Sequence, residues 1–328
     1  MLIKSIDDKN LTFRQLEALL PLATPGQKKR ITKDLYALRK GYQNELQTAY
    51  LIDFAYGKKQ NTLILHDLRL VFDGQVAQID HLLINAGAIY LLESKYFSQK
   101  VTIDAHGNWT AHYDSGSHGI DSPLEQNRRH KILVSRILQQ YDLIPKRLGI
   151  KVNLPIYDYV LLSTNCRIEG DIPPNVIKAD RVETTIDRDL DTQLDRFFGL
   201  NTFKLLVNII THNEMHAIAD ALLCFHQPLT IDYAAKYGIT PPPPIDRLLL
   251  QKLTRLRDTL AKKRQTEPAA ILPDNILEAF ARYRPQNPKE TKRLTSMNDM
   301  QFRRVGYKFL NTVLTHQKLQ EKHITAEV

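Results

Sequence analysis

Apolar and polar positions follow two different periods along the first half of the chain. Apolar residues at three- and four-residue spacing predict helices over residues 11–20, 28–54 and 123–140. Runs rich in β-branched and aromatic residues predict strands over residues 63–72, 76–84, 88–97, 101–103, 109–113 and 156–163. Turn sequences such as Asp73-Gly74 separate the first three strands, which predicts a meander. This part of the chain is therefore expected to be an α/β domain.

The rest of the chain is predicted to be mostly helical. Helical patterns cover much of residues 187–226 and recur over residues 245–320, with breaks at Pro268, Pro273, Pro285 and Pro288. Between them lies Pro241-Pro242-Pro243-Pro244, which cannot lie inside a helix and favours an extended spacer. We therefore expect an N-terminal domain over residues 1–240, a proline linker over 241–244 and a helical domain over 245–320.

Composition excludes several classes of protein. The chain has 328 residues, of which 43% are hydrophobic and 25% are charged, as in ordinary globular proteins. No apolar run approaches the roughly 18 residues of a membrane helix, and the N-terminus lacks the apolar core of a signal peptide. We therefore expect a cytoplasmic protein with no membrane contact. Its two cysteines, Cys166 and Cys224, are expected to be buried, reduced thiols.

Positive charge is concentrated near the end of the chain. The whole chain has a formal net charge of +9. Residues 241–328 contain 17 Lys and Arg against 9 Asp and Glu, which leaves residues 1–240 nearly neutral. A basic module joined to a neutral body indicates a polyanionic partner, of which nucleic acid is the commonest. A basic surface that only keeps the protein soluble is the alternative on charge alone.

Charged residues inside two of the predicted strands form a candidate catalytic site. Glu93 and Lys95 project from the same face of an apolar strand, together with Leu91. Asp80 lies in the preceding strand, so a hairpin would bring its carboxylate close to Glu93. Glu45 lies on the apolar stripe of the long helix and would approach from above the sheet. Ionised carboxylates this close repel one another unless a proton or a cation lies between them.

All-oxygen ligation favours a hard divalent cation, Mg²⁺ or Mn²⁺. Such an ion would lower the pKa of a water molecule and polarise a phosphoryl oxygen, while Lys95 stabilises charge or orients the water. The sequence therefore predicts metal-assisted hydrolysis of a phosphodiester bond. His81, beside Asp80, would point to the opposite face and is expected to be structural. A Glu-x-Lys sequence is also common on solvated surfaces, where it has no catalytic role.

Five local sequences carry a resemblance to a nuclease family. They are GYQNE (41–45), QIDH (78–81), GAIYLLESK (87–95), Trp109 and SPLEQN (122–127). In this order they resemble the nuclease-related domain, NERD, of the PD-(D/E)xK nuclease superfamily, over about residues 38–165. The resemblance implies a restriction-endonuclease-like core, with a mixed central sheet flanked by helices. Asn44 departs from the pattern, because the family usually has glycine before the glutamate.

The resemblance also implies a role for each site residue. It implies five catalytic residues, namely Glu45, Asp80, Glu93, Lys95 and Gln126. Asp80 and Glu93 would be the ligands of Mg²⁺ or Mn²⁺, with the carbonyl of Ser94 as the third. Lys95 would be the catalytic lysine. Glu45 would reach the metal through water, and the glutamine would border the site.

The helical C-terminal part resembles a second family. The sequences LLLQKLTRLRDTL (248–260), EPAAILPDNILEAFARYRPQNPKE (267–290) and FRRVGYKFLNTV (302–313) are similar to the HRDC domain of RecQ-type helicases and RNase D. Members of this family bind nucleic acid or dock to proteins. The residues expected to contact phosphate are Arg282, Arg284, Lys292, Arg293, Arg303, Arg304 and Lys308. Met297-Asn298-Asp299 replaces the glycine-rich turn of many members.

Two functions are consistent with these observations. The first is a metal-dependent bacterial nuclease, with DNA favoured over RNA as its substrate, in DNA processing, repair or defence. The second is a non-catalytic scaffold that binds nucleic acid or docks to a helicase or repair complex. The sequence lacks the GxxxxGK[ST] of a phosphate-loop motor and the GxSxG of a serine hydrolase. His212 and His216 could share a metal, but no third ligand is evident.

Overall fold

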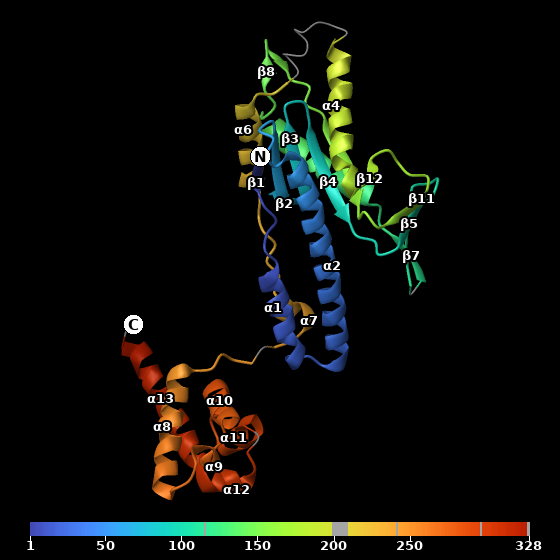
Figure 1. Ribbon diagram of the computed structural model, residues 1–328. Helices are drawn as coiled ribbons and strands as arrows, with labels where there is room; N and C mark the ends of the chain where they lie inside the picture. The colour runs from blue at the N-terminus through green and yellow to red at the C-terminus, as the bar shows by residue number, and fades with distance from the viewer. Residues whose placement is uncertain (115, 199–208, 241, 296, 327–328) are drawn as a thin grey trace. The chain divides into compact units, whose positions relative to one another are not determined.

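The structure is a computed structural model that describes residues 1–114, 116–198, 209–240, 242–295 and 297–326, with the backbone alone at 193–198 and 321–326. The chain divides into two compact units, residues 1–237 and 238–328 (Figure 1). Pro241 of the expected linker and residues 199–208 of the expected helical region lie outside the described residues. Among the described helices, none is long and apolar enough to span a membrane.

A six-stranded mixed sheet forms the centre of the first unit. Its strand order is β1-β2-β3-β4-β10-β12, with antiparallel pairing from β2 to β4 and parallel pairing elsewhere. The strands are β1 Leu2–Lys4, β2 Thr62–Phe72, β3 Gln75–Asn85, β4 Ile89–Lys95, β10 Ile156–Leu162 and β12 Val176–Lys178. The predicted meander is confirmed as β2-β3-β4. The short strands β1 and β12, which the sequence pattern did not predict, form the two edges.

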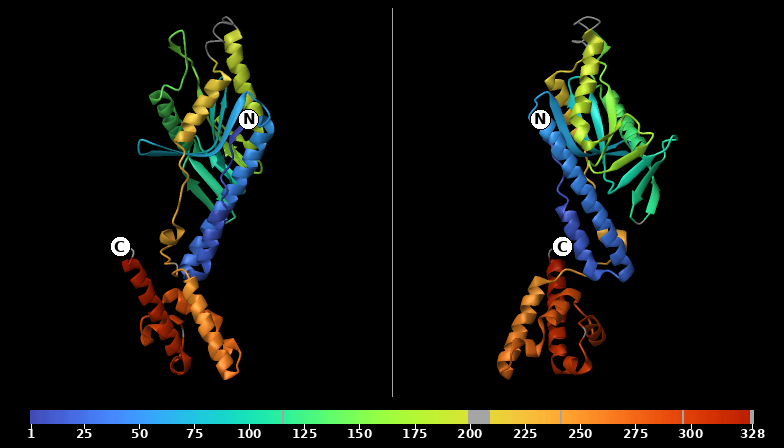
Figure 2. Two further views of the ribbon diagram at one scale, coloured as in Figure 1. Left: turned by 90° about the vertical axis from the view of Figure 1, so that its left-hand side faces the viewer. Right: turned by 45° about the vertical axis from the view of Figure 1, so that its right-hand side comes forward.

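Helices cover both faces of this sheet (Figures 1 and 2). The helical segments are α1 Asn10–Leu19, η1 Leu20–Leu22, α2 Pro25–Tyr56, α3 Pro123–Gln140, η2 Ala179–Arg181, α4 Val182–Phe198, α6 His212–Cys224 and α7 Tyr233–Tyr237. On one face, Ile52 of α2 and Ile186 of α4 share a buried cluster with Tyr90. On the other face, Val134 of α3 and Ile218 of α6 share a cluster with residues of β2, β3 and β4. The central sheet is therefore buried on both sides.

The long helix α2 begins at a capping box. The Thr24 side chain accepts a hydrogen bond from the Gln27 main chain, and the Gln27 side chain accepts one from the Thr24 main chain. Pro25 follows at the first helical position, where it loses no hydrogen bond. The helix then runs for 32 residues, or about 48 Å at 1.5 Å per residue. It is longer than predicted, and Glu45 lies in its second half.

A second, four-stranded sheet projects from the first unit (Figure 1). Its order is β11-β5-β6-β7, with strands β5 Lys100–Ile103, β6 Trp109–Tyr113, β7 Gly116–Ile120 and β11 Arg167–Gly170. The predicted hairpin is confirmed as β5-β6. Strands β7 and β11 were not predicted, because neither shows an apolar alternation. Two further strands of two residues each, β8 Lys146–Arg147 and β9 Ile150–Lys151, pair with one another and belong to neither of these sheets.

The expectation of two buried cysteines is half wrong. Cys166 is buried with Trp109 beneath the small sheet. Cys224 is exposed at the last position of α6. The buried stripe of this helix includes Ile218 and Leu222, and position 224 does not fall on that stripe.

Within its described residues, the second unit contains helices and the segments that connect them, and no strands. Its helical segments are α8 Arg247–Arg264, α9 Pro268–Ile271, α10 Asp274–Tyr283, α11 Pro288–Thr295, α12 Asp299–Gln301, η3 Phe302–Gly306 and α13 Tyr307–Ala326. Leu253, Phe280 and Phe309 lie in a core of their own. Pro268 and Pro288 start helices rather than interrupt them, because proline is tolerated at the first helical position.

We predict that Gly170→Ala destabilises the first unit. Gly170 has φ of +95°, and a Cβ there would clash with the main-chain oxygen of Ile103. We expect a loss of more than about 1 kcal/mol in the free energy of unfolding by urea. The control is Gly41→Ala in α2, where a Cβ meets nothing within 4 Å and should add about 0.5 to 1 kcal/mol. Equal stability of the two variants would contradict this account.

Candidate active site

Strands β3 and β4 separate at the position of the expected site. They are paired from Ile84–Ile89 to His81–Leu92, and their main-chain pairing ends there. Beyond this point β3 stays with β2, and β4 stays with β10. We call this separation the fork, and Asp80 and Glu93 are its first residues on the two strands. The predicted hairpin therefore places the two carboxylates on adjacent strands where the sheet opens.

Hydrogen bonds join the charged residues of the fork. Lys95 Nζ lies 2.7 Å from Glu93 Oε1 and donates to Gln126 Oε1 of α3 at 3.1 Å. Asp80 Oδ2 accepts a hydrogen bond from the main-chain nitrogen of Ser94 at 2.7 Å. Glu93 is 2% exposed, whereas 29% of the Lys95 side chain is exposed. The lysine ammonium therefore forms the accessible side of a buried carboxylate.

Glu45 enters this site from α2 with a partner that the sequence analysis did not identify. Its Oε2 lies 2.7 Å from Nζ of Lys9, which precedes α1. The same ammonium lies 4.0 Å from Oδ2 of Asp67 in β2. Asp67 has φ of +52° and hydrogen-bonds to the Gln78 side chain at 2.8 Å. No local pattern marks Lys9, because its partners lie far away in the sequence.

Burial and charge act together on the two carboxylates of the fork. Burial raises the pKa of Asp80 well above its usual range, and the neighbouring Glu93 and Glu45 raise it further. Burial also raises the pKa of Glu93, although the Lys95 ammonium lowers it in part. Both carboxylates therefore take up protons more readily than they would in water. A bound cation would oppose both effects.

Two buried polar atoms at the fork lack hydrogen-bond partners within the described residues. They are Glu93 Oε2 and His130 Nδ1, which lie 3.8 Å apart. Burial, followed by the charges of Lys95 and Arg129, lowers the pKa of His130 to about 4, so its ring is neutral near pH 7. His130 was not among the predicted site residues, although it follows Gln126 by four positions on the same helix face.

The residues at the fork fit a divalent cation. A buried carboxylate oxygen without a partner is costly unless a bound group completes it, and Glu93 Oε2 is such an atom. Across the described ranges, no group of three Asp, Glu, His or Cys side chains could by itself hold a metal ion, and this includes the surroundings of His212 and His216. Protein side chains at the fork would therefore supply part of the coordination shell. Mg²⁺ commonly takes its remaining ligands from water and substrate phosphates.

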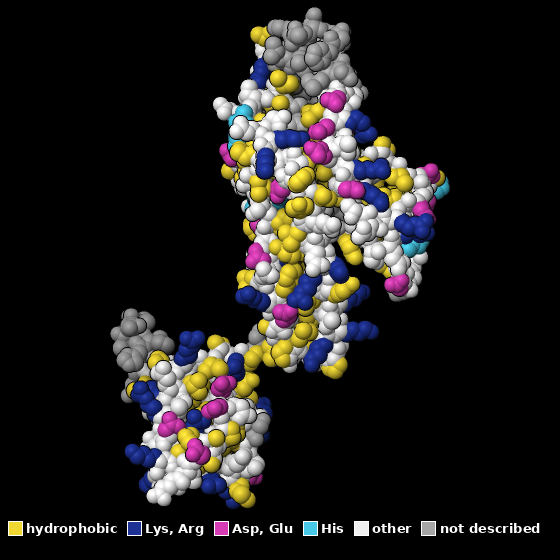
Figure 3. Space-filling view, viewed as in Figure 1, with side chains coloured by type: hydrophobic (Ala, Val, Ile, Leu, Met, Phe, Trp, Pro, Cys, Tyr) yellow, Lys and Arg dark blue, Asp and Glu magenta, His cyan; other side chains and the backbone are white. Residues whose placement is uncertain are grey.

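The basic residues expected to bind nucleic acid occupy different environments in the second unit. Arg282 donates to the Pro243 carbonyl at 3.1 Å, and Arg284 lies 3.6 Å from Asp246. Lys292 pairs with Asp299 at 2.6 Å. The exposed members of the set are Arg293, Arg303, Arg304 and Lys308. Figure 3 shows basic side chains around the outline of this unit and acidic ones nearer the middle of the viewed face.

The turn before η3 is built by side chains instead of glycine. Asn298 and Gln301 form a capping box at the start of α12. Asp299 follows, and its carboxylate is neutralised by the Lys292 ammonium. This turn therefore presents a capped helix start and an ion pair.

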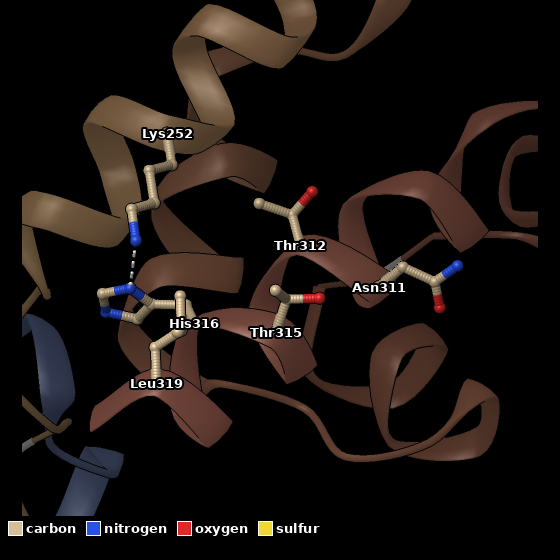
Figure 4. A pocket seen from close by; sticks show the side chains of 6 residues that line it. All are labelled: Lys252, Asn311, Thr312, Thr315, His316 and Leu319. Atoms are coloured by element: carbon tan, nitrogen blue, oxygen red, sulfur yellow. Dashed lines mark hydrogen bonds between the residues drawn. The ribbon is translucent and has the colours of Figure 1, made fainter. Parts of the chain in front are cut away.

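A cavity of about 240 Å³ lies in the second unit between α8 and α13 (Figure 4). Lys252 Nζ donates to His316 Nδ1 at 3.0 Å, and His316 Nε2 lies 3.0 Å from Asp246 Oδ2. The buried His316 therefore links the Asp246 carboxylate, whose side chain is 8% exposed, to the exposed Lys252. His316 is far from the other two residues in the sequence, and no local pattern marks the three as a group.

The two units define an α/β domain with a charged site and a separate helical domain. Residues 40–163 match the model of the nuclease-related domain, NERD, and residues 246–313 match the HRDC domain. The chain therefore contains a NERD domain followed by an HRDC domain, as both resemblances implied. No curated protein sequence matches the chain. The NERD domain indicates nuclease activity, and the HRDC domain indicates nucleic-acid binding.

We predict that Asp80→Asn stabilises the metal-free protein at high pH. Because the folded pKa of Asp80 exceeds the unfolded one, the wild type loses stability as pH rises from the unfolded value, near 3.8, through the folded value. Each tenfold change in proton affinity corresponds to about 1.4 kcal/mol. In thermal unfolding with EDTA, the variant should have a higher melting temperature than the wild type at pH 8. This difference should disappear below pH 4.

Asp104→Asn is the control of opposite sign. Hydrogen bonds from Asn108 lower the pKa of Asp104, so its contribution is present above the unfolded pKa and is lost as pH falls. This variant should be slightly less stable than the wild type at pH 8. A gain for Asp80→Asn that does not change with pH would contradict the electrostatic explanation.

Proposed function

We propose that this protein is a Mg²⁺- or Mn²⁺-dependent nuclease that hydrolyses phosphodiester bonds in DNA. One observation carries the proposal: a buried carboxylate oxygen of Glu93 has no partner among the described residues, beside Asp80 and Lys95, within a matched NERD domain. The expected setting is DNA processing, repair or defence. The HRDC domain is proposed to hold the nucleic acid.

Each residue at the fork has a proposed role. Asp80 and Glu93 would hold the ion together with the carbonyl of Ser94. When bound, the ion lowers the pKa of a water molecule and polarises a phosphoryl oxygen. Lys95 is partly exposed and held by Glu93 and Gln126, so its ammonium is oriented to stabilise negative charge that develops on the phosphoryl group.

Glu45 and Lys9 complete the site on the side of α2. The ion pair between them keeps a carboxylate near the fork without leaving its charge unopposed. Glu45 is proposed to act through a water molecule. Gln126 is proposed to orient Lys95, to which it is hydrogen-bonded.

The second unit is proposed to raise the local concentration of substrate. Residues 241–328 carry 17 Lys and Arg against 9 Asp and Glu. Contacts from such residues to phosphate position a nucleic acid without reading its sequence. Because both domains belong to one chain, binding by one makes the encounter with the other intramolecular.

A non-catalytic scaffold is the second candidate function. It is favoured by the two lysines that already pair with carboxylates, Lys95 with Glu93 and Lys9 with Glu45. Such a protein would bind nucleic acid or dock to a helicase or repair complex without hydrolysis.

Cleavage assays distinguish the two candidates. We expect the full chain to cut labelled DNA with Mn²⁺ or Mg²⁺ and not with EDTA. Lys95→Ala should lower kcat by at least about 100-fold, because it removes a group that stabilises the transition state. In thermal unfolding, Mn²⁺ should stabilise the wild type by mass action and should have little effect on Glu93→Gln.

Lys131→Ala is a matched control for Lys95→Ala. Lys131 is also partly exposed, lies on α3, and pairs with Asp158 at 2.7 Å. It should leave cleavage close to the wild-type rate. Binding of DNA without cutting, and no response to Mn²⁺, would favour the scaffold.

Binding of DNA should depend on the exposed basic residues of the HRDC domain. In the triple variant Arg303→Ala, Arg304→Ala, Lys308→Ala, we expect the slope of log affinity against log salt to fall by about 0.9 for each lost phosphate contact with duplex DNA. Lys289→Ala removes an exposed charge outside the proposed set and is the control. An unchanged slope in the triple variant would refute the proposed contact surface.

A further inference from the structure

Four polar side chains form a continuous chain of hydrogen bonds on the sheet face opposite the charged site. Asp53 Oδ1 of α2 lies 3.3 Å from His66 Nε2 of β2. His66 Nδ1 lies 2.8 Å from His81 Nδ1 of β3, and His81 Nε2 lies 2.9 Å from Ser94 Oγ of β4. His66 and His81 are 1% and 0% exposed, whereas Asp53 is partly exposed. We call these four residues the histidine chain.

The bonds of the histidine chain determine where each proton lies. Both rings are almost fully buried, which favours the neutral form of an imidazole. A neutral imidazole donates from one nitrogen and accepts at the other. His66 donates from Nε2 to the Asp53 carboxylate, and its Nδ1 accepts from Nδ1 of His81. Nε2 of His81 then accepts from the Ser94 hydroxyl.

Ser94 connects the histidine chain to the fork. Its hydroxyl bonds to His81, and its main-chain N–H donates to Asp80 Oδ2 at 2.7 Å. The main-chain pairing of β3 with β4 ends two residues before Ser94, at His81–Leu92. The two bonds of Ser94 therefore join the strands at the position where they begin to separate.

We propose that His66 and His81 are positioning residues, which hold Ser94 and thereby fix the distance between the carboxylates of Asp80 and Glu93. Repulsion between the two carboxylates tends to open the fork, and a rigid chain of buried rings resists that opening. Hydrogen bonds inside a protein are stronger electrostatically than in water. Apolar side chains would fill the same sheet positions without burying polar atoms, so packing alone does not account for two histidines.

The first test needs no catalytic activity. NMR spectra of the full chain with ¹⁵N-labelled histidine, recorded in EDTA, report which ring nitrogen carries each proton. We expect the proton of His66 on Nε2 and that of His81 on Nδ1. A proton on Nε2 of His81 would overturn the proposal, irrespective of whether the protein cleaves nucleic acid.

Two substitutions at His81 separate positioning from packing. Glutamine places its terminal amide near the position of Nε2 and keeps an acceptor for Ser94, whereas asparagine places it near Nδ1 and loses that acceptor. In metal-free protein, exchange of the Ser94 amide hydrogen should accelerate about tenfold or more in His81→Asn and in Ser94→Ala. In His81→Gln it should stay within about threefold of the wild type.

The activity test rests on the proposed nuclease function. With Mn²⁺ and DNA, kcat should fall about 10- to 100-fold in His81→Asn and in Ser94→Ala, and KM should change by less than about threefold. His81→Gln should retain most of the wild-type kcat. The double variant His81→Asn, Ser94→Ala should lose no more than either single variant, because both remove the same bond.

The outcomes separate the two proposals. Wild-type kcat and wild-type exchange of the Ser94 amide in His81→Asn would overturn the positioning role. If the wild type cuts no substrate but shows the expected protonation and exchange pattern, the nuclease proposal fails. The positioning of Asp80 by the histidine chain then stands as a structural property of the fork.

Discussion

The first unit is constrained by the repulsion between two carboxylates in a sheet that helices cover on both faces. Asp80 and Glu93 lie where β3 and β4 separate, and burial raises the pKa of both. Nearby groups offset the free-energy cost of burying these negative charges. The Lys95 ammonium bonds to Glu93, the Ser94 N–H bonds to Asp80, and Lys9 pairs with Glu45 of α2. One oxygen of Glu93 still lacks a partner within the described residues. The arrangement therefore suits one additional cation.

The topology of the sheet explains why the site lies at this position. Where two adjacent strands stop pairing, the sheet opens, and the side chains at that point are no longer covered by the neighbouring strand. Here β3 remains with β2 while β4 remains with β10. Helices on opposite faces then supply further groups, since α2 brings Glu45 and α3 brings Gln126 and His130. Ligands often bind at comparable points in open α/β sheets, where neighbouring elements diverge.

The second unit shows that net charge alone does not define a binding surface. Lys292 is paired with Asp299, and Arg284 lies near Asp246. Arg303 and Arg304 are exposed beside α13 and are better placed for phosphate. The match to the HRDC domain therefore becomes a specific proposal only when the environment of each basic side chain is considered.

The sequence by itself determined the main elements and the charged pair of the site. Strand alternation placed Glu93 and Lys95 on one face, and a hairpin turn placed Asp80 beside them, because these relations are local. The tertiary structure alone decided that Lys9 pairs with Glu45, that two histidines meet beneath the fork, and that short strands such as β7 and β11 join a second sheet. The periodicity of apolar residues shows which face of a helix or strand is buried. It does not show which distant residue packs against that face, because that depends on how the elements pack together.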